Sequence, residues 1–262
     1  MNPVITLTTD FGSRDYFAGS VKGVILQINP AIRIVDISHD IAPFSISQGA
    51  YVIASAYPYF PKGSIHLVVV DPGVGSARRS ILAVSRSGFF LAPDNGVLSY
   101  ILKEDGPCQI YELTEKKFFL DSSGRTFHGR DIFAPVAAWL STGLESGSFG
   151  SPVSDPVTFP VRTPETHENR IKGQILYVDH YGNLISNIRL SDFPGIDLKA
   201  ATVNIGKRRL SGGKRFYAEV EKGALSFLFN SSGSLEIFKR EGNAADDLNI
   251  RNFEELTLEL GK

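Results

Sequence analysis

Two aspartates follow directly after short apolar runs that have the length and composition of β-strands. Asp10 follows residues 5–8, and Asp71 follows residues 64–70, a nearly continuous apolar run. In open α/β sheets, ligands bind beyond the carboxyl ends of the strands, so both carboxylates stand where an active site is expected. Such a carboxylate can hold ribose hydroxyls, bind a metal ion or act as a base. It can also merely cap the following turn, which the Pro-Gly pair after Asp71 favours, and the sequence leaves both interpretations open.

Arg78, Arg79 and His128 add cationic and titratable groups to this set. Arg78 and Arg79 come shortly after Asp71, so one of them can pair with that carboxylate while the other faces solvent. The glycines in residues 71–79 match neither a P-loop nor a GxGxxG loop, which argues against phosphate binding. His128 stands beside an arginine at the start of a predicted helix and can titrate near neutrality, although a lone histidine more commonly only hydrogen-bonds a loop. The other histidines show no cluster spacing and are interpreted as structural: His39, His66, His167 and His180.

Polar turns in the second half of the chain carry groups that suit a nucleoside or an amino acid. Asp179, Asn183 and Ser231 offer amine and amide recognition. Aromatic residues nearby offer faces that can stack on a purine: Tyr181, Phe216 and Tyr217. Turn chemistry alone also explains Asp, Asn, Gly and Ser at these positions, so both interpretations stay open here as well.

The elements that must position these groups alternate between strands and helices over the first 160 residues. The expected elements are strands at 5–8, 32–37 and 64–70, and helices at 16–28, 47–57 and 134–140. Strands separated by helices predict a largely parallel sheet that is covered on both faces. Asp131 is expected to cap the last helix, with Pro135 tolerated in its first turn. These patterns predict an α/β domain over residues 1–160.

The character of the chain changes between residues 147 and 169, where small residues and prolines dominate and a linker is expected. After it, short strands follow one another closely without helices between them. The expected strands are 174–178, 184–188, 201–205, 224–229, 235–238 and 256–260. This spacing predicts a smaller all-β domain, an antiparallel barrel or sandwich, over residues 170–262.

The composition is that of an ordinary globular protein and argues against several classes of partner. Of 262 residues, 42% are hydrophobic and 21% are charged, with a net charge of −1. No Lys/Arg cluster is evident, so a nucleic-acid partner is not expected. The apolar runs are too short to span a membrane, and no signal peptide is evident. The single cysteine, Cys108, fits a cytoplasmic location, and the absence of CxxC and HExxH predicts no metal site.

Six motifs together resemble those of the S-adenosyl-L-methionine (SAM) hydrolases, also called SAM hydroxide adenosyltransferases, which are related to the fluorinase and the chlorinase. The motifs are TLTTDFG (6–12), DPGVGSARR (71–79), PDNG (93–96), TFHGRDIFAP (126–135), DHYGNLISNI (179–188) and NSSGSLEI (230–237). Each is short, but all six occur in family order over nearly the whole chain. The resemblance implies a three-layer α/β/α N-terminal domain, a smaller C-terminal β-barrel and a homotrimer. Its active sites would lie between the N-terminal domain of one subunit and the C-terminal domain of the next.

The resemblance also implies a reaction and a role for each matching residue. SAM, as substrate and not as cofactor, is cleaved to adenosine and L-methionine by attack of water at ribose C5′. Asp71, Arg78 and His128 match the hydrolytic set, Asp10 falls at the position that holds the ribose diol, and Asn183 falls at an adenine-binding position. Asp179 and Ser231 fall at positions that hold the amino acid part of methionine. The remaining matches to the substrate site are Phe11, Phe44, Tyr181, Tyr217, Glu236 and Lys239.

Departures from the halogenases favour water over halide as the nucleophile. The halogenases carry tyrosines where Asp71 and His128 stand, and the fluorinase has a serine at the position of Gly129 that helps to hold fluoride. Ser232 replaces an arginine that grips the substrate carboxylate, so carboxylate recognition must differ, and the linker is too short for the fluorinase's extra loop. The alternatives are a halide-dependent SAM halogenase on the same scaffold, a non-catalytic SAM or adenosine binder, and a metal-dependent hydrolase using Asp10, Asp71 and His128.

Overall fold

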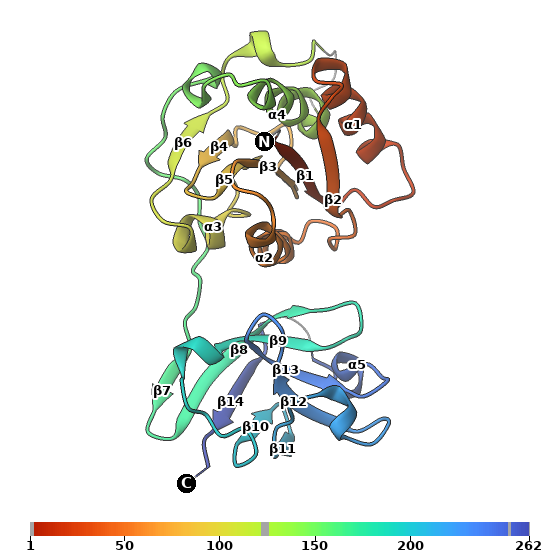
Figure 1. Ribbon diagram of the computed structural model, residues 1–262, viewed down its shortest axis with the longest axis vertical. Coiled ribbons are helices and arrows are strands. Elements are labelled where there is room, and N and C mark those ends of the chain that lie inside the picture. Colours follow the sequence, from red (N-terminus) through yellow and green to blue (C-terminus); the bar gives the residue numbers. More distant parts are fainter. Residues whose placement is uncertain (1–2, 122–125, 251–252, 262) are drawn as a thin grey trace. The chain divides into compact units, whose positions relative to one another are not determined.

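The computed structural model describes residues 3–121, 126–250 and 253–261. The chain divides into two compact units, residues 1–161 and 162–262. The first unit combines a sheet with helices, and the second consists mainly of strands (Figure 1). The helices within the described ranges all fall short of the length or apolar character that crossing a membrane requires.

A six-stranded sheet forms the centre of the first unit, in the order β2-β1-β3-β5-β4-β6. Its strands are β1 (Val4–Thr9), β2 (Arg33–Ser38), β3 (Ser64–Val69), β4 (Ser80–Val84), β5 (Gly88–Pro93) and β6 (Gln109–Glu112). Strands β1, β2, β3 and β5 run parallel, while β4 is antiparallel to both β5 and β6. The prediction of a largely parallel sheet is confirmed, and the β4–β5 hairpin adds an antiparallel part that the sequence pattern does not reveal.

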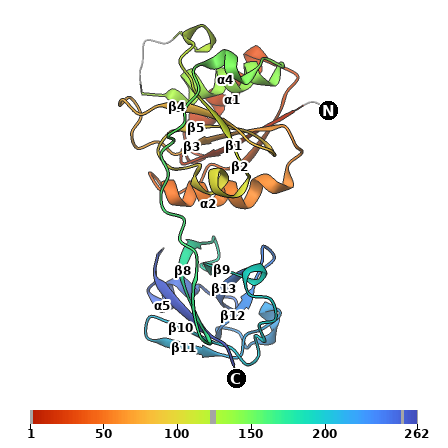
Figure 2. The same cartoon turned by 90° about the vertical axis from the view of Figure 1, so that its left-hand side faces the viewer.

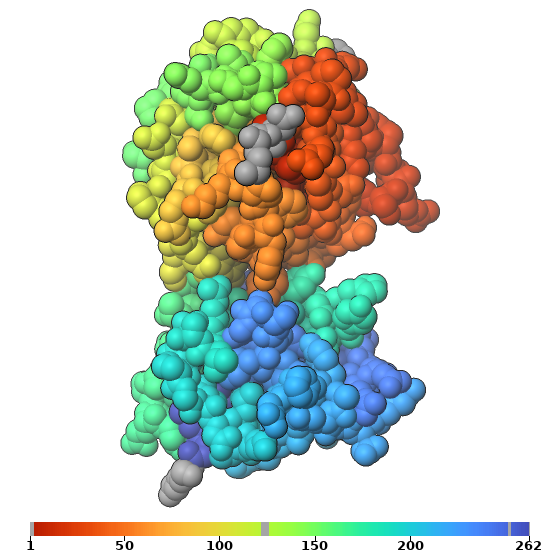
Figure 3. Space-filling view, viewed as in Figure 1, coloured from red at the N-terminus to blue at the C-terminus, as the bar shows by residue number. Residues whose placement is uncertain are grey.

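Helices cover both faces of this sheet and give the first unit three layers (Figure 2). On one face, α1 (Phe17–Ile28) and α4 (Ala134–Ser141) pack against each other, and their surfaces meet in the space-filling view (Figure 3). On the other face lie α2 (Ile46–Ala56) and the short α3 (Ser99–Glu104). Each face of the sheet has its own hydrophobic core. Within β3, Leu67 packs in the core beneath α1 and α4, and Val68 packs in the core beneath α2 and α3. Successive side chains of a strand point to opposite faces, so a continuous apolar run is what a doubly covered strand requires.

The segment that leads into α4 differs from the prediction. Gly129–Phe133 form a π-helical turn that continues directly into α4. Asp131 therefore lies inside helical structure and does not cap α4, and its Oδ1 accepts a hydrogen bond from Arg130 Nε at 2.6 Å. Turns of this kind occur often at functional sites, and this one begins immediately after His128.

The second unit is an antiparallel sheet that curls into a nearly closed barrel, which confirms the predicted all-β barrel. Its strands are β7 (Glu165–His167), β8 (Arg170–Val178), β9 (Leu184–Arg189), β10 (Thr202–Ile205), β11 (Arg208–Ser211), β12 (Leu225–Phe229), β13 (Ser234–Lys239) and β14 (Glu255–Glu259). They follow the order β11-β10-β14-β8-β9-β13-β12, with β7 beside β8, and the end strands β11 and β12 contact each other. A helix, α5 (Ala244–Leu248), is capped by Asn243, whose side chain accepts from the Asp246 N–H.

Candidate functional site

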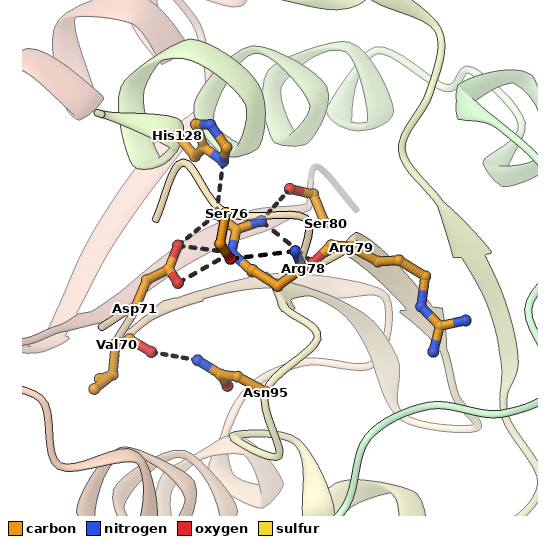
Figure 4. Close-up of polar contacts among 8 residues, drawn as sticks. All are labelled: Val70, Asp71, Ser76, Arg78, Arg79, Ser80, Asn95 and His128. Carbon is orange, nitrogen blue, oxygen red and sulfur yellow. Dashed lines mark hydrogen bonds and ion pairs between the residues drawn. The ribbon is translucent and has the colours of Figure 1, made fainter. Parts of the chain in front are cut away.

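Arg78 joins Asp71 and His128 into one cluster beyond the carboxyl end of β3 (Figure 4). Arg78 Nε donates to both carboxylate oxygens of Asp71 at 3.0 Å, and Nη2 donates to Oδ2 at 2.5 Å. The same Nη2 lies 2.6 Å from His128 Nδ1. The side chains of Arg78 and Asp71 are only 9% and 5% exposed, so water screens this ion pair weakly. Of the two arginines that the sequence offers to Asp71, the structure selects Arg78.

Neighbouring turns hold this cluster in place. Asn95 Nδ2 donates to the carbonyl oxygen of Val70 at 2.8 Å, which ties the end of β3 to the turn after β5. Arg78 Nη1 donates to Ser80 Oγ at 2.8 Å and to the carbonyl oxygen of Arg79 at 3.2 Å. All three guanidinium nitrogens of Arg78 thus have acceptors, so its plane is fixed before any ligand arrives.

The contact with Arg78 determines how the His128 ring is protonated. A guanidinium has donors only, so the Nδ1 atom that faces Arg78 Nη2 must accept a hydrogen bond and carries no proton. The tautomer that fits this contact carries its ring hydrogen on Nε2. An ionised carboxylate, by contrast, only accepts. The cluster thus offers one strong acceptor, the carboxylate of Asp71, while the N–H groups of Arg78 are bonded within the cluster and to its neighbours.

Asp10 lies at the end of β1, the strand that pairs with β3. The two strands are parallel with Thr9 opposite Val69, so Asp10 and Asp71 follow neighbouring strand ends. Asp10 Oδ2 accepts a hydrogen bond from the Phe44 N–H at 2.9 Å. Phe44 has a φ of 68° and is 70% exposed. A left-handed backbone is unfavourable for an aromatic residue, and the bond to Asp10 offsets part of that strain.

Phe11 packs into an aromatic cluster beside the loop of His128. Its ring centroid lies 6.0 Å from that of Phe17 and 5.6 Å from that of Phe127. It also fills the space next to Gly129, where an added Cβ would lie 3.0 Å from Phe11 Cζ. Position 129 therefore has no room for a side chain unless Phe11 moves.

A cavity of about 680 Å³ in the second unit gathers most of the residues that the family resemblance assigns to substrate binding there. It is lined by Asp179, Tyr181, Asn183, Tyr217, Ala218, Lys239, Arg240, Glu241 and Gly242. Tyr181 is 73% exposed and Tyr217 is 47% exposed, so both rings have faces open to a ligand. The volume is in the range of small-molecule sites.

Asp179 and Asn183 hold each other in a tight turn after β8. Asp179 Oδ1 accepts from the N–H groups of Tyr181 and Asn183 at 2.9 and 2.8 Å, and its Oδ2 accepts from Asn183 Nδ2 at 3.0 Å. Gly182 has a φ of 81°, and an added Cβ would come within 2.1 Å of Asn243. Only glycine fits at that position. Turn chemistry therefore accounts for these residues, and the same turn places both polar side chains at the cavity.

Glu236 lies beneath Tyr217 and not in the cavity lining. It is 3% exposed and accepts hydrogen bonds from Tyr217 Oη at 2.8 Å and from Asn230 Nδ2 at 3.0 Å. Burial raises the pKa of the Glu236 carboxyl above its ordinary value, although the two hydrogen bonds act in the opposite direction. Burial and the Glu236 carboxylate also raise the pKa of Tyr217. Glu236 thus fixes the hydroxyl end of the Tyr217 side chain.

Ser231 and Lys239 occupy two different positions around this cavity. Ser231 is exposed in the turn between β12 and β13, outside the cavity lining. Its neighbour Ser232 donates from Oγ to Asn230 Oδ1 at 2.8 Å. Lys239 lines the cavity, and its Nζ donates to Asp247 Oδ1 at 2.6 Å.

Arg79 has a different environment from the one that the sequence suggests. The arginine not paired with Asp71 was expected to face solvent; Arg79 is partly exposed, but two carboxylates hold its guanidinium. Arg79 Nε donates to Asp94 Oδ2 and its Nη1 donates to Asp155 Oδ1, both at 2.7 Å. Asp94 Oδ1 also accepts from the Val157 N–H at 2.7 Å. The second arginine of the motif therefore anchors the segment around residues 155–157 near the end of the first unit.

His39 lies at the same strand ends, in surroundings that the sequence did not indicate. Its Nδ1 lies 2.8 Å from Thr9 Oγ1, immediately before Asp10. The signal that could have drawn attention to it is its place after the predicted strand at 32–37, because the carboxyl ends of parallel strands meet at one edge of a sheet.

Comparisons with known proteins give a consistent result. The family model described as the SAM hydroxide adenosyltransferase N-terminal domain matches residues 5–150, and the C-terminal domain model matches residues 173–257. Two relatives named (R)-S-adenosyl-L-methionine hydrolase are similar over nearly their full length. The one from Methanocaldococcus jannaschii is 37% identical, over 97% of this chain and 95% of that protein. The one from Salinispora tropica is 34% identical, over 99% and 98%.

Solved structures and more distant relatives agree with these matches. The crystal structure of an uncharacterized conserved protein from Thermotoga maritima superposes with a TM-score of 0.92 and 33% identity, covering 97% of this chain and 99% of that chain. Proteins named fluorinase are also similar, at 24–30% identity.

Proposed function

This chain belongs to the SAM hydroxide adenosyltransferase family, and from that premise we propose that it hydrolyses SAM to adenosine and L-methionine. Both family models match, one in each unit, and three nearly full-length relatives carry the hydrolase name. The observation that carries the proposal is the contact of Arg78 with both Asp71 and His128. Mere binding of SAM does not require such a cluster.

The reaction is a displacement at ribose C5′. The water oxygen forms a bond to C5′ while the C5′–S bond breaks, and the sulfonium leaves as the neutral thioether of methionine. The leaving group therefore needs no general acid. The attacking water develops positive charge and must lose a proton, so it needs an acceptor and a favourable field. Much of the rate is expected to come from holding water in line with the C5′–S bond.

Asp71 is our proposed acceptor of the water proton. Arg78 only donates, and the Nδ1 atom of His128 is already bonded to Arg78, so the carboxylate is the acceptor that the cluster retains. Arg78 keeps Asp71 ionised and oriented, while it lowers the basicity of the carboxylate. In this proposal His128 holds Arg78 through its Nδ1 atom and so helps to keep the Asp71 carboxylate in position.

Asp10 binds the ribose diol in this proposal. One of its oxygens accepts from the Phe44 N–H, which leaves the other oxygen for the hydroxyls of the sugar. The exposed ring of Phe44 lines the pocket beside it. Phe11 follows Asp10 directly, and in this proposal it lines the same part of the substrate site while its ring packs on Phe17 and Phe127.

The cavity of the second unit supports the assignments made there. We propose that Asn183 binds adenine, and that Asp179 and Ser231 hold the amino acid part of methionine. Two exposed rings, Tyr181 and Tyr217, are available for stacking. Glu236 would affect the substrate indirectly, through its hydrogen bond with Tyr217. Lys239 would contact the substrate from the cavity wall, where its Nζ also donates to Asp247.

We propose that the protein is a cytoplasmic homotrimer whose sites combine the first unit of one subunit with the second unit of another. The division of the proposed substrate contacts between Asp10 in one unit and Asn183 in the other supports this idea. Light scattering should give a trimer. A mixture of Asp71→Ala and Asn183→Ala chains, reassembled together, should regain activity because some shared sites are intact. A fully active monomer would contradict the proposal.

Incubation with SAM in halide-free buffer tests the reaction. Adenosine and L-methionine should appear in equal amounts, unaffected by a chelator. The (R) epimer at sulfur should react faster than the (S) epimer, as the names of the relatives suggest. Absence of adenosine, or 5′-halo-adenosine as the main product with halide present, would refute the proposal. Loss of activity with the chelator would favour the metal-dependent alternative.

A further inference from the structure

His39 follows β2 and lies next to the strand end that carries Asp10. Strands β1 and β2 are parallel, with Thr8 opposite Ser38. His39 Nδ1 lies 2.8 Å from the hydroxyl of Thr9, and Thr9 is 1% exposed. The His39 side chain is itself only 11% exposed. A partly buried histidine–threonine contact therefore stands directly before the proposed ribose-binding carboxylate.

Hydrogen bonds to the backbone tie the same two loops together on both sides of Asp10. The Gly12 N–H donates to the carbonyl oxygen of His39 at 2.8 Å, and the Ile41 N–H donates to that of Thr9 at 3.4 Å. The Phe11 N–H donates to Thr9 Oγ1 at 3.3 Å. Thr9, Phe11 and Gly12 are thus bonded to His39, to Ile41 or to the Thr9 hydroxyl, so these contacts hold the backbone on both sides of Asp10.

Asp36 lies on the other side of the imidazole. His39 Nε2 is 3.1 Å from Asp36 Oδ1, although it makes no well-directed hydrogen bond. A carboxylate oxygen carries only lone pairs, so Nε2 must bear a hydrogen to lie so close to it. In the neutral ring, Nδ1 then accepts from the Thr9 hydroxyl, and the oxygen of that hydroxyl accepts from the Phe11 N–H. The relay of Asp36, His39 and Thr9 thus has hydrogen bonds at His39 Nδ1 and at Thr9 Oγ1, and a close but poorly directed contact at His39 Nε2.

Lys22 completes the relay at the surface, with its Nζ 2.6 Å from Asp36 Oδ2. Burial raises the pKa of Asp36, but Lys22 and His39 lower it more strongly, so the pKa of this carboxyl lies below its ordinary value. Asp36 therefore stays ionised at neutral pH and holds the imidazole from behind.

We propose that His39 is a positioning residue for Asp10, acting through Thr9 and the loop of residues 9–12. The inference rests on the proposed role of Asp10 in holding the ribose diol. The order carboxylate, imidazole, hydroxyl is also that of nucleophilic triads. Here the hydroxyl is buried and accepts from the backbone N–H of Phe11, so the relay serves orientation and not attack.

Calorimetric binding of adenosine and of 2′,3′-dideoxyadenosine tests this inference, because only adenosine offers a diol to Asp10. The unsubstituted chain should bind adenosine more tightly. His39→Leu and Thr9→Val should each weaken adenosine binding about 10-fold, the scale of one hydrogen bond to a charged group, and leave dideoxyadenosine binding within about twofold. Thr9→Ser keeps the hydroxyl and His39→Asn keeps a polar partner for it, so both should retain most of the affinity. In hydrolysis, His39→Leu should raise KM more than it lowers kcat.

Controls separate positioning from a general structural effect. His167→Leu, on an exposed residue of β7, should change neither affinity. His39→Leu combined with Asp10→Asn should cost less than the sum of the two single changes, since both act on one contact. Equal weakening of adenosine and dideoxyadenosine binding would show a merely structural role and overturn the inference. If His39→Leu does not fold, the same comparison is made with Thr9→Val. If the unsubstituted chain binds no adenosine, the proposed function itself fails. If it prefers adenosine and neither variant changes that preference, only the role of His39 fails.

Discussion

Arg78 Nη2 lies 2.6 Å from His128 Nδ1, and the same nitrogen donates to the carboxylate of Asp71. Arg78 reaches the site from the turn after β3, and His128 reaches it from the start of the π-helical turn before α4. A guanidinium stays charged at any working pH and presents its donors in one plane. One side chain therefore fixes the carboxylate, the tautomer of the histidine and the distance between them.

Replacing Arg78 by lysine should keep the charge and lose the geometry. An ammonium group on a flexible stem cannot reach Asp71, Ser80 and His128 in one plane. We expect kcat to fall about 100-fold, while KM for SAM changes less than about threefold. Steady-state kinetics measure both values, and ¹⁵N NMR of labelled histidine should show an Nε2-protonated His128 in the unsubstituted chain alone. A kcat close to that of the unsubstituted chain would remove Arg78 from the mechanism.

Substitutions in the Asp71–Arg78–His128 cluster of the first unit should mainly lower the rate of hydrolysis, and substitutions in the cavity of the second unit should mainly weaken SAM binding. Asp71→Ala and His128→Ala should lower single-turnover rates by roughly 10²–10⁴-fold and change SAM affinity little, because these groups act mainly in the transition state. Asn183→Ala should mainly weaken affinity, since adenine does not react. Calorimetry beside single-turnover rates measures both effects. If Asp71→Ala binds SAM poorly but hydrolyses what it binds at the normal rate, Asp71 positions the substrate and accepts no proton.

The predictable parts of the fold are those where one strand or helix faces a core along its whole length. The apolar run that became β3 and the alternation of strands with helices were enough to predict the first unit. The β4–β5 hairpin was not predicted, because its two strands are short and joined by a polar turn at residues 85–87. Strand β11 was not predicted either. It is an edge strand that begins with the exposed Arg208 and Arg209, so it lacks the apolar alternation that indicates a strand.

The candidate site shows the same limit. Asp71 and Arg78 are seven residues apart, so their pairing could be foreseen, although not which arginine pairs. His39 is 30 positions from Thr9, and their contact depends on the parallel pairing of β1 and β2. No local spacing reports such a contact. The roles proposed for the residues of the second unit come from the family resemblance. The local sequence around them predicts only turns.

A side chain at position 129 should impair turnover through Phe11. An alanine Cβ would lie 3.0 Å from the Phe11 ring, so Phe11 or the adjacent loop of His128 must shift. Overpacking of this kind costs about 1–3 kcal/mol. We expect Gly129→Ala to lower kcat about 10-fold, on the scale of 1.4 kcal/mol. Adding Phe11→Leu, which makes room, should restore part of the rate. Unchanged kinetics in Gly129→Ala, or no recovery in the double variant, would contradict this account.

His66 should make the first unit sensitive to mild acid. It lies in β3 at 1% exposure, with Nδ1 2.8 Å from Thr6 Oγ1 and its ring stacked on Phe90. Burial lowers the pKa of His66 from 6.5 to about 4, although the charge of Asp105 acts in the opposite direction. Between these two values the unfolded chain binds a proton that the folded chain does not. The free energy of unfolding should therefore fall as the pH decreases from 6.5 to 4, by up to about 3 kcal/mol.

Urea unfolding of the unsubstituted chain and of His66→Gln at several pH values between 7 and 4 measures this contribution. Trp139 is the only tryptophan and lies in α4 of the same unit, so its fluorescence follows the unit that contains His66. Glutamine keeps a polar group near Thr6 but cannot titrate, so His66→Gln should be less stable at pH 7 and approach the unsubstituted chain as the pH falls. Titrating carboxylates change the free energy of unfolding of both chains alike, so the difference between the two chains reports the titration of His66. His167→Gln, on an exposed residue, should run parallel to the unsubstituted chain, and a parallel course for His66→Gln would contradict the assignment.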